Sequence, residues 1–386
     1  MTPGFRQQLD PSGRSTDAKA FECGLRSKIV GQEEAIRTLV ELYQVFRAGL
    51  NPQGRPVGSL LFLGPTGSGK TRIVEAAAEI LFGDSRALVK VDCAEFQHSH
   101  EIAKLIGAPP GYMGHRETHP LITQEALAAS HTDKLKLSFL LFDEIEKASE
   151  ALWQLLLGVL DKATLRLGDN RRVDLSNTVI FMTSNLGGGE ITELMTGGMG
   201  FVQPKDKPLT GLDEKVERTA FEAARRRFSP EFMNRLDKVV VFHPLKRDQL
   251  EEVLDIELAQ LQQRILEIAS RQFLFHVGDA GREFLLEEGT DPRYGARHLR
   301  RAIEQHMVRP LASLLATEQV HTGDYVCVDW DGKSHELAFV RENQNIPFTD
   351  QQTEQQPGVS HVGTRSGKST KAPIATPAQR FAPGFT

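Results

Sequence analysis

The stretch LLFLGPTGSGKT, residues 60–71, decides the fold of this chain. Four apolar residues lead into a loop that matches G-x-x-x-x-G-K-[ST], and residues 72–81 after it are typical of a helix. Glycines let such a loop curl so that its N–H groups converge on phosphate oxygens, and the helix N-terminus adds its dipole. Ordinary residue frequencies give about 0.02 chance matches in a chain of this length. We therefore expect a strand, a phosphate-binding loop and a helix.

This loop predicts a site for ATP with Mg²⁺. Lys70 is expected to reach the β- and γ-phosphates, and Thr71 is expected to ligate Mg²⁺. The expected nucleotide-binding residues of the loop are Gly64, Pro65, Thr66, Gly67, Ser68, Gly69, Lys70 and Thr71.

Two more apolar stretches end in polar residues. The stretch FLLFDE, residues 139–144, ends in adjacent carboxylates. Asp143 suits holding Mg²⁺, and Glu144 suits activating the attacking water as a general base. The second stretch ends in Thr183-Ser184-Asn185, where the Asn185 amide is suited to orient that water or to contact the γ-phosphate. Alone, these patterns also fit a solvated loop and a plain turn, but the upstream phosphate loop favours function.

The apolar runs predict a parallel sheet. Near-continuous runs at 60–63, 88–91, 139–142, 179–182 and 239–242 are typical of strands buried on both faces. Because they alternate with helical stretches, we expect an α/β fold with three layers. After Pro244 the pattern becomes helical, with apolar residues three and four apart from Leu250 to Ile268. We expect a second long helix over 297–316 and two short strands at 325–330 and 337–340.

These patterns predict four parts of the chain. Residues 1–22 are polar and are expected to be a loose, disordered lead-in, and residues 342–386 are expected to be a disordered tail. Between them we expect a large ATPase domain over 23–243 and a smaller, mostly helical domain over 244–341.

Composition excludes several classes of function. The 386 residues carry a net charge of −5, which does not favour binding to nucleic acid. The basic runs Arg171-Arg172, Arg225 to Arg227 and Arg300-Arg301 are interpreted as solvated helix or loop faces. Three distant cysteines favour neither a zinc site nor a disulfide scaffold. The first residues lack the apolar core of a signal peptide, and no stretch is long enough for a membrane span, so we expect a cytoplasmic protein.

Several stretches together resemble the Clp-type AAA+ unfoldases, in particular the second ATPase ring of ClpB, ClpC and ClpA. They occur in the family's order over roughly residues 22–340. They are IVGQ at 29–32, GPTGSGKT at 64–71, GAPPGYMG at 107–114, LLFDEIEKA at 140–148, MTSNLG at 182–187, FSPEFMNRLD at 228–237 and GARHLRRAI at 295–303. The resemblance implies an AAA+ large domain with a Clp-type small domain.

The resemblance also implies roles for further residues. The family forms homo-hexameric rings with ATP bound between subunits, and Val30 is expected to pack on the adenine. Arg235 is similar to the arginine finger that reaches the neighbouring subunit's γ-phosphate, and Arg297 to the sensor of nucleotide state on the small domain. For each arginine the alternative is a surface salt bridge. Tyr112 is similar to the pore-loop aromatic that grips protein substrates, the alternative being a tyrosine packed on its own domain.

The chain also departs from the family. We expect one ATPase module with neither an N-terminal substrate domain nor a coiled-coil middle domain. Residues 115–120 read HRETHP where relatives are usually acidic and glycine-rich, and Ser229 stands where relatives often have Arg. These departures weaken the case for disaggregation, which in ClpB uses the middle domain, and leave ATP hydrolysis intact.

We therefore expect an ATP-driven motor that unfolds or remodels proteins. One alternative is an AAA+ switch that remodels a single dedicated partner without threading it, and another is a nucleotide-dependent scaffold with negligible turnover. A third is the ATPase subunit of a Clp-type protease. Met199-Gly200-Phe201 resembles the short loop with which ClpC, ClpA and ClpX dock on ClpP, although the tripeptide also fits a chance match in a glycine-rich loop.

Overall fold

The computed structural model describes residue 10 and residues 12–108, 119–196, 212–267, 272–291 and 295–342. Within these ranges, none of the helices is both long enough and apolar enough to pass through a membrane.

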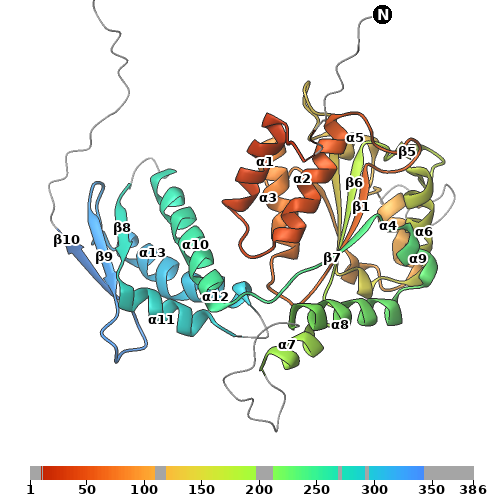
Figure 1. The fold of residues 1–386 in the computed structure, drawn as a ribbon. Helices are drawn as coiled ribbons and strands as arrows, with labels where there is room; N and C mark the ends of the chain where they lie inside the picture. The colour runs from red at the N-terminus through yellow and green to blue at the C-terminus, as the bar shows by residue number, and fades with distance from the viewer. Residues whose placement is uncertain are drawn as a thin grey trace, which may run out of the picture. The chain divides into compact units, whose positions relative to one another are not determined.

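A parallel sheet of five strands organises the first 240 residues (Figure 1). The strand order is β2-β3-β6-β1-β7, and every neighbouring pair is parallel. The strands are β1 (Gly58–Leu63), β2 (Val89–Asp92), β3 (Ser138–Asp143), β6 (Thr178–Ser184) and β7 (Lys238–Val241). All five coincide with the predicted apolar runs to within one or two residues. The prediction of a parallel α/β sheet is confirmed.

Helices cover both faces of this sheet. On β1, Leu60 and Phe62 point to one face and Leu61 and Leu63 to the other, and all four are fully buried. Helices α1 (Thr16–Arg26), α2 (Glu33–Arg47) and α3 (Lys70–Phe82) pack on the first face. The second face is covered by α4 (Ile102–Ile106), α5 (Gln124–Ala128), α6 (Glu150–Lys162), α7 (Gly188–Thr196), α8 (Leu212–Arg227) and α9 (Pro230–Arg235). The result is the expected three-layer domain.

Short elements complete this domain. They are the 3-10 turns η1 (Cys93–Glu95), η2 (Ser99–Glu101) and η3 (Ile145–Lys147) and the antiparallel pair β4 (Thr164–Arg166) and β5 (Arg172–Asp174). The pair β4–β5 was not predicted, because three-residue strands with polar or charged residues on both sides of one apolar position carry almost no alternation signal.

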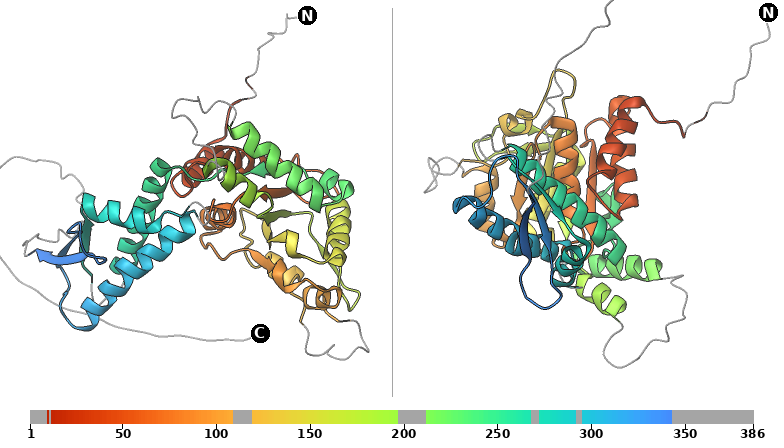
Figure 2. Two further views of the ribbon diagram at one scale, coloured as in Figure 1. Left: turned by 90° about the horizontal axis from the view of Figure 1, so that it is seen from below. Right: turned by 90° about the vertical axis from the view of Figure 1, so that its left-hand side faces the viewer.

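A separate hydrophobic cluster forms after residue 244. It is built from α10 (Arg247–Glu267), β8 (Leu274–Val277), α11 (Asp279–Gly289), α12 (Ala296–Ile303), η4 (Glu304–Val308), α13 (Arg309–Ala316), β9 (Tyr325–Asp329) and β10 (Ala338–Glu342). The predicted apolar stripe of α10 is buried at Leu250, Leu254, Leu258, Leu261 and Ile265. A sheet in the order β10-β9-β8 lies beside these helices in both views of Figure 2. This region is the expected smaller helical domain, with one strand, β8, that was not predicted.

The expected loose lead-in is wrong for residues 16–22, which belong to α1. Ser15 caps this helix by accepting a hydrogen bond from the Ala18 N–H, and Phe21 packs on Tyr43 with ring centres 5.0 Å apart. Ala18, Phe21 and Leu25 lie three and four residues apart and are buried, so one narrow apolar face is enough to dock an otherwise polar helix.

Two other sequence predictions need correction in this second domain. The single helix expected over 297–316 contains a π-helical segment at 304–308, between α12 and α13. Pro310 lacks the N–H that an unbroken α-helix would use there, which favours local widening of the turn. Residue 342, assigned to the disordered tail, is the last residue of β10, and residues 343–386 lie outside the described residues.

Candidate active site

The three polar motifs meet at the carboxyl ends of adjacent strands. In the order β3-β6-β1, residue Leu63 pairs with Ser184, and Phe142 pairs with Met182. The phosphate loop after β1, the carboxylates after β3 and Asn185 after β6 therefore lie side by side. Ligands of open parallel sheets bind at this edge.

The backbone of the phosphate loop is shaped for an anion. Gly64, Gly67 and Gly69 have φ values of 143°, 79° and 99°, which favour glycine. A Cβ at Gly64 would lie 2.4 Å from the Phe242 carbonyl oxygen, so no larger residue fits there. Gly69 is the N-cap residue of α3 and offers no side-chain cap, and no described residue accepts a hydrogen bond from the N–H groups of residues 67–69. This donor set fits a phosphate group.

Lys70 is buried in the middle of the site. Its Nζ donates to the carbonyl oxygens of Gly64 and Pro65, both at 2.8 Å, and to Asn185 Oδ1 at 2.9 Å. Burial lowers the pKa of Lys70 to about 8, although Glu146 and the other nearby carboxylates oppose the shift. The ammonium is thus poised where an added anion would stabilise its charge.

Asp143 and Thr71 together form an oxygen site. The Thr71 hydroxyl donates to Asp143 Oδ1 at 3.1 Å, and the Thr183 hydroxyl donates to the same oxygen. Burial opposes ionisation of Asp143, but the hydrogen bond from Thr183 and the charge of Lys90, 3.2 Å away, outweigh it and hold its pKa below the ordinary value. A hydroxyl beside an ionised carboxylate suits Mg²⁺, which takes its remaining ligands from water and phosphates.

Glu144 is held at the edge of the same site. Its φ of 56° is left-handed, which is uncommon for a non-glycine residue and often marks a functional position. Its Oε1 accepts a hydrogen bond from Asn185 Nδ2 at 3.2 Å, and its other oxygen pairs with Lys147. Asn185 therefore bridges Lys70 and Glu144 through the two ends of one amide.

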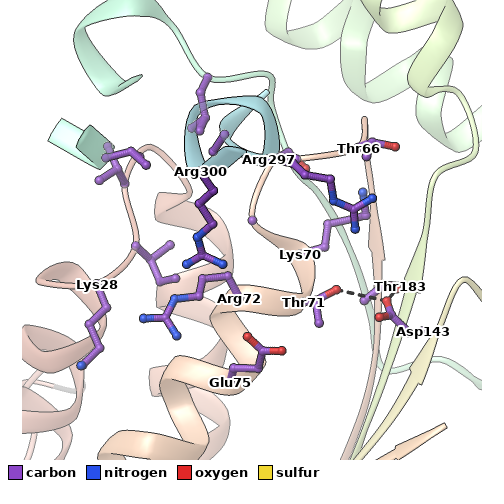
Figure 3. A pocket seen from close by; sticks show the side chains of 18 of the residues that line it. Lys28, Thr66, Lys70, Thr71, Arg72, Glu75, Asp143, Thr183, Arg297 and Arg300 are labelled. Atoms are coloured by element: carbon purple, nitrogen blue, oxygen red, sulfur yellow. Dashed lines mark hydrogen bonds between the residues drawn. The ribbon is translucent and has the colours of Figure 1, made fainter. Parts of the chain in front are cut away.

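A cavity of about 310 Å³ opens beside these residues (Figure 3). Val30 lines it together with Leu245, Val253 and Ile256, which supplies an apolar surface for a base. Arg297 lines it too and points toward the end where Lys70 lies. The Ala296 N–H, at the start of α12, donates to the Gly67 carbonyl oxygen at 3.2 Å.

The remaining predicted residues lie elsewhere. Arg235 does not line this cavity; its side chain, 39% exposed, pairs with Asp161 and, at 3.6 Å, with Glu231. The pairing with Asp161 is the salt bridge given above as the alternative for Arg235. Tyr112 and the segment 199–201 lie outside the described residues.

Sequence reasoning missed several residues that line or support the site. Lys90 lies 3.2 Å from Asp143, and Arg300 pairs with Glu257 at 2.6 Å on the cavity wall. Glu146 accepts a hydrogen bond at Oε1 from the Asn185 N–H, at 3.1 Å. Only Glu146 carried a signal, since it lies two residues after the predicted base. The ion pairs of Lys90 with Asp143 and of Arg300 with Glu257 depend on tertiary contacts.

Comparisons with known families and proteins agree with this geometry. The family model described as AAA domain (Cdc48 subfamily) matches residues 55–239. The model for the C-terminal, D2-small domain of ClpB protein matches residues 245–328. The chaperone protein ClpB of Corynebacterium efficiens is 39% identical over 319 residues, which is 83% of this chain and 33% of the relative.

Two further similarities extend the comparison. The ATP-dependent Clp protease ATP-binding subunit ClpC of Staphylococcus saprophyticus is 38% identical over 317 residues, 81% of this chain and 36% of the relative. A solved Hsp104:casein complex from S. cerevisiae superposes with a TM-score of 0.70 at 29% identity, covering 85% of this chain and 53% of that chain. The chain thus spans about a third of the length of these curated relatives. Its two matched modules, in this order and with this fold, identify it as an AAA+ ATPase of the Clp family that resembles the second ATPase module of ClpB and ClpC.

Proposed function

We propose that this chain hydrolyses ATP and uses the energy to unfold or remodel protein substrates. The phosphate loop and Lys70 would bind the phosphates, Thr71 and Asp143 would hold Mg²⁺, and Val30 would contact the adenine. Bound Mg²⁺ would neutralise charge on the phosphates. Glu144 would accept a proton from the attacking water, which Asn185 would help to orient.

The hydrogen-bonded series from Lys70 through Asn185 to Glu144 carries this proposal. It joins the phosphate-binding group to the general base over two contacts, of 2.9 and 3.2 Å. A plain turn after β6 would need neither contact. Once phosphate oxygens compete for Lys70, the Asn185 amide is free to reorient, and with it the hydrogen bond to Glu144. ATP binding would thereby set the position of the base.

The arginines complete the proposed site from two directions. Arg297 would approach the phosphates from the small domain of the same chain, where it already lines the cavity. Arg235 would reach the γ-phosphate of a neighbouring subunit in a homo-hexamer, which agrees with its position outside the cavity of its own chain. Guanidinium groups suit this task because they offset charge on the transferring phosphoryl group.

Protein is the proposed substrate class. The superposed Hsp104 is named in complex with casein, and the two bacterial relatives are named as a chaperone and as an ATP-binding subunit of a protease. Tyr112, between glycines, would contact polypeptide in the central pore of the ring. Its aromatic ring would grip by apolar contact without reading sequence.

We also propose docking on a ClpP-type protease through Met199, Gly200 and Phe201. Two apolar side chains within a polar, glycine-rich stretch of sequence would suit insertion into a pocket of a partner. The protein would be mixed with ClpP from the same cell and ATP, with co-migration and degradation of an unfolded substrate as readouts. Docking that Phe201→Ala does not weaken, or no docking by the parent, would leave a stand-alone remodeller.

A substrate trap tests the proposed function. A Glu144→Gln chain should bind ATP without releasing its substrate, so partly folded proteins should co-purify with it in ATP and not in ADP. Glu150→Gln, an exposed glutamate at the start of α6, is the matched control and should retain none. Equal recovery of proteins in ATP and ADP would contradict an ATP-driven grip on substrates.

A further inference from the structure

Arg227, the last residue of α8, is exposed, as expected from its basic run, but its guanidinium also makes specific contacts. Its Nη2 and Nε both donate to the Glu146 carbonyl oxygen, at 2.7 and 3.1 Å. Its guanidinium carbon lies 4.7 Å from the centre of the Trp153 ring. Arg225, on the same helix, is exposed and makes no hydrogen bond or ion pair with the described residues. The contacts of Arg227 with the Glu146 carbonyl and the Trp153 ring therefore distinguish it from Arg225, although the proposed function assigns it no task.

Trp153 and Arg227 hold two consecutive carbonyl groups. The Trp153 Nε1–H donates to the Ile145 carbonyl oxygen at 3.1 Å, and Arg227 takes the next carbonyl, that of Glu146. Both carbonyls belong to η3, the turn directly after Glu144. The Glu146 side chain in turn accepts from the Asn185 N–H at 3.1 Å. We call residues 144–146 the catalytic loop. The hydrogen bonds from Trp153 and Arg227 hold its backbone in place.

The same aromatic contacts continue into the helix that carries Arg235. Phe228, next to Arg227, is 3% exposed and meets the Trp153 ring edge-on, with ring centres 5.5 Å apart. The Phe228 ring lies 5.3 Å from that of Phe232 in α9. Helix α9 has only six residues and ends at Arg235, so its position depends on this buried packing.

We propose that Arg227 is a positioning residue that joins the catalytic loop of its own subunit to α9, and so to the arginine offered to the next subunit. The proposal rests on the proposed role of Arg235 toward a neighbouring site. When Glu144 and Asn185 rearrange around ATP, the carbonyl of Glu146 moves with them, and Arg227 transmits that displacement to α9. Close-packed elements shift as units, so a small change at one site reaches the other. One ATP site thereby regulates hydrolysis at its neighbour.

The first test compares Arg227→Met with Arg225→Met. Methionine keeps apolar contact with Trp153 and removes both hydrogen bonds to the Glu146 carbonyl. Because slight misplacement of catalytic groups is costly, kcat for ATP should fall roughly 10- to 100-fold with the KM for ATP and the melting temperature unchanged. Arg225→Met should behave as the parent, and Arg227→Lys, which retains one cationic donor, should recover part of kcat. A rise in KM or a lowered melting temperature in place of the kcat loss would overturn the positioning role.

Mixed rings test separately the proposed effects of Arg227 on the catalytic loop and on α9. A donor chain carrying Lys70→Ala offers an intact Arg235 but an inactive site, and a recipient chain carrying Arg235→Ala has an intact site but no finger. Hydrolysis then occurs only at an interface where the ATP site of a recipient chain faces Arg235 of a donor chain. Arg227→Met is added to the donor in one mixture and to the recipient in another, with Arg225→Met as the control in each.

The proposal expects hydrolysis to fall roughly tenfold or more in both mixtures, because Arg227 serves α9 in the donor and the catalytic loop in the recipient. A loss in the recipient alone, or in the donor alone, would overturn the joint role. If the unmodified donor and recipient form mixed rings and restore no hydrolysis, the proposed finger role of Arg235 fails instead. The two failures are therefore distinguishable.

Discussion

The Lys70 ammonium and the Asn185 amide oxygen lie 2.9 Å apart, although 115 residues separate them in sequence. This hydrogen bond joins the phosphate loop after β1 to the end of β6. Together with the two carbonyl oxygens at 2.8 Å, it uses all three ammonium hydrogens. Phosphate oxygens would have to compete with these acceptors, so the site exchanges protein contacts for contacts with nucleotide.

Removing the Lys70 ammonium should abolish useful nucleotide binding. Charge-assisted hydrogen bonds contribute about 1.5–3 kcal/mol each, so losing two in Lys70→Ala predicts ATP affinity lower by roughly 10²–10⁴-fold. Titration with a fluorescent ATP analogue measures this loss. Lys136→Ala, an exposed lysine, is the control and should bind as the parent. Unchanged ATP affinity in Lys70→Ala would contradict the assignment of residues 64–71 as the phosphate-binding loop.

Nucleotide affinity should depend on pH near the pKa of Lys70. Burial lowers this pKa from 10.5 to about 8 in the nucleotide-free protein, and phosphate binds the protonated form. Affinity should therefore be flat below pH 8 and fall above it, to roughly a tenth at pH 9. Calorimetry in buffers of different ionisation enthalpy should show proton uptake on binding at pH 8.5. Constant affinity from pH 7.5 to 9.5 would contradict this account of Lys70.

The same pKa shift has the opposite consequence for folding. Between pH 8 and 10.5 the unfolded chain holds this proton and the folded, nucleotide-free chain has lost it. The free energy of unfolding therefore gains from Lys70 as pH rises through this window, and below pH 8 that gain is absent. Denaturant unfolding should show this Lys70-dependent rise in the free energy of unfolding in the parent and not in Lys70→Met.

Arg235→Ala should uncouple binding from hydrolysis. ATP affinity should change little, because Arg235 does not line the cavity of its own chain, while hydrolysis should fall by roughly 10³-fold. Steady-state ATPase and nucleotide titration measure the two effects. Mixing with Lys70→Ala chains should restore part of the activity. A variant that hydrolyses ATP at the parental rate would remove Arg235 from the site.

Tyr112→Ala should separate hydrolysis from mechanical work. Tyr112 has no proposed role in binding or hydrolysing ATP, so ATPase activity should stay within about threefold of the parent, while unfolding of a tagged, stably folded reporter should be lost. Reporter fluorescence in the presence of ATP follows the unfolding. Undiminished unfolding would favour the alternative in which one dedicated partner is remodelled without threading.

The sequence predicted the parts of the site that lie within single motifs. Each strand that carries a site residue is a near-continuous apolar run, and chain continuity places Asp143, Glu144 and Asn185 at strand ends. Contacts set by tertiary packing were not predictable. Lys90 meets Asp143 because β2 and β3 pair in a register that aligns Asp92 with Asp143. Arg227 reaches Glu146 only because η3 and α8 pack on the same face of the sheet.

The most direct test of the account is the ATP turnover of Glu144→Gln, measured beside its ATP affinity. The substitution keeps the hydrogen bond to Asn185 available and removes the proton acceptor. The account predicts unchanged or tighter ATP binding, with single-turnover hydrolysis slower by roughly 10²–10⁴-fold. Hydrolysis at the rate of the parent, with ATP bound at this site, would contradict the assignment of Glu144 as the general base and with it the proposed catalytic centre.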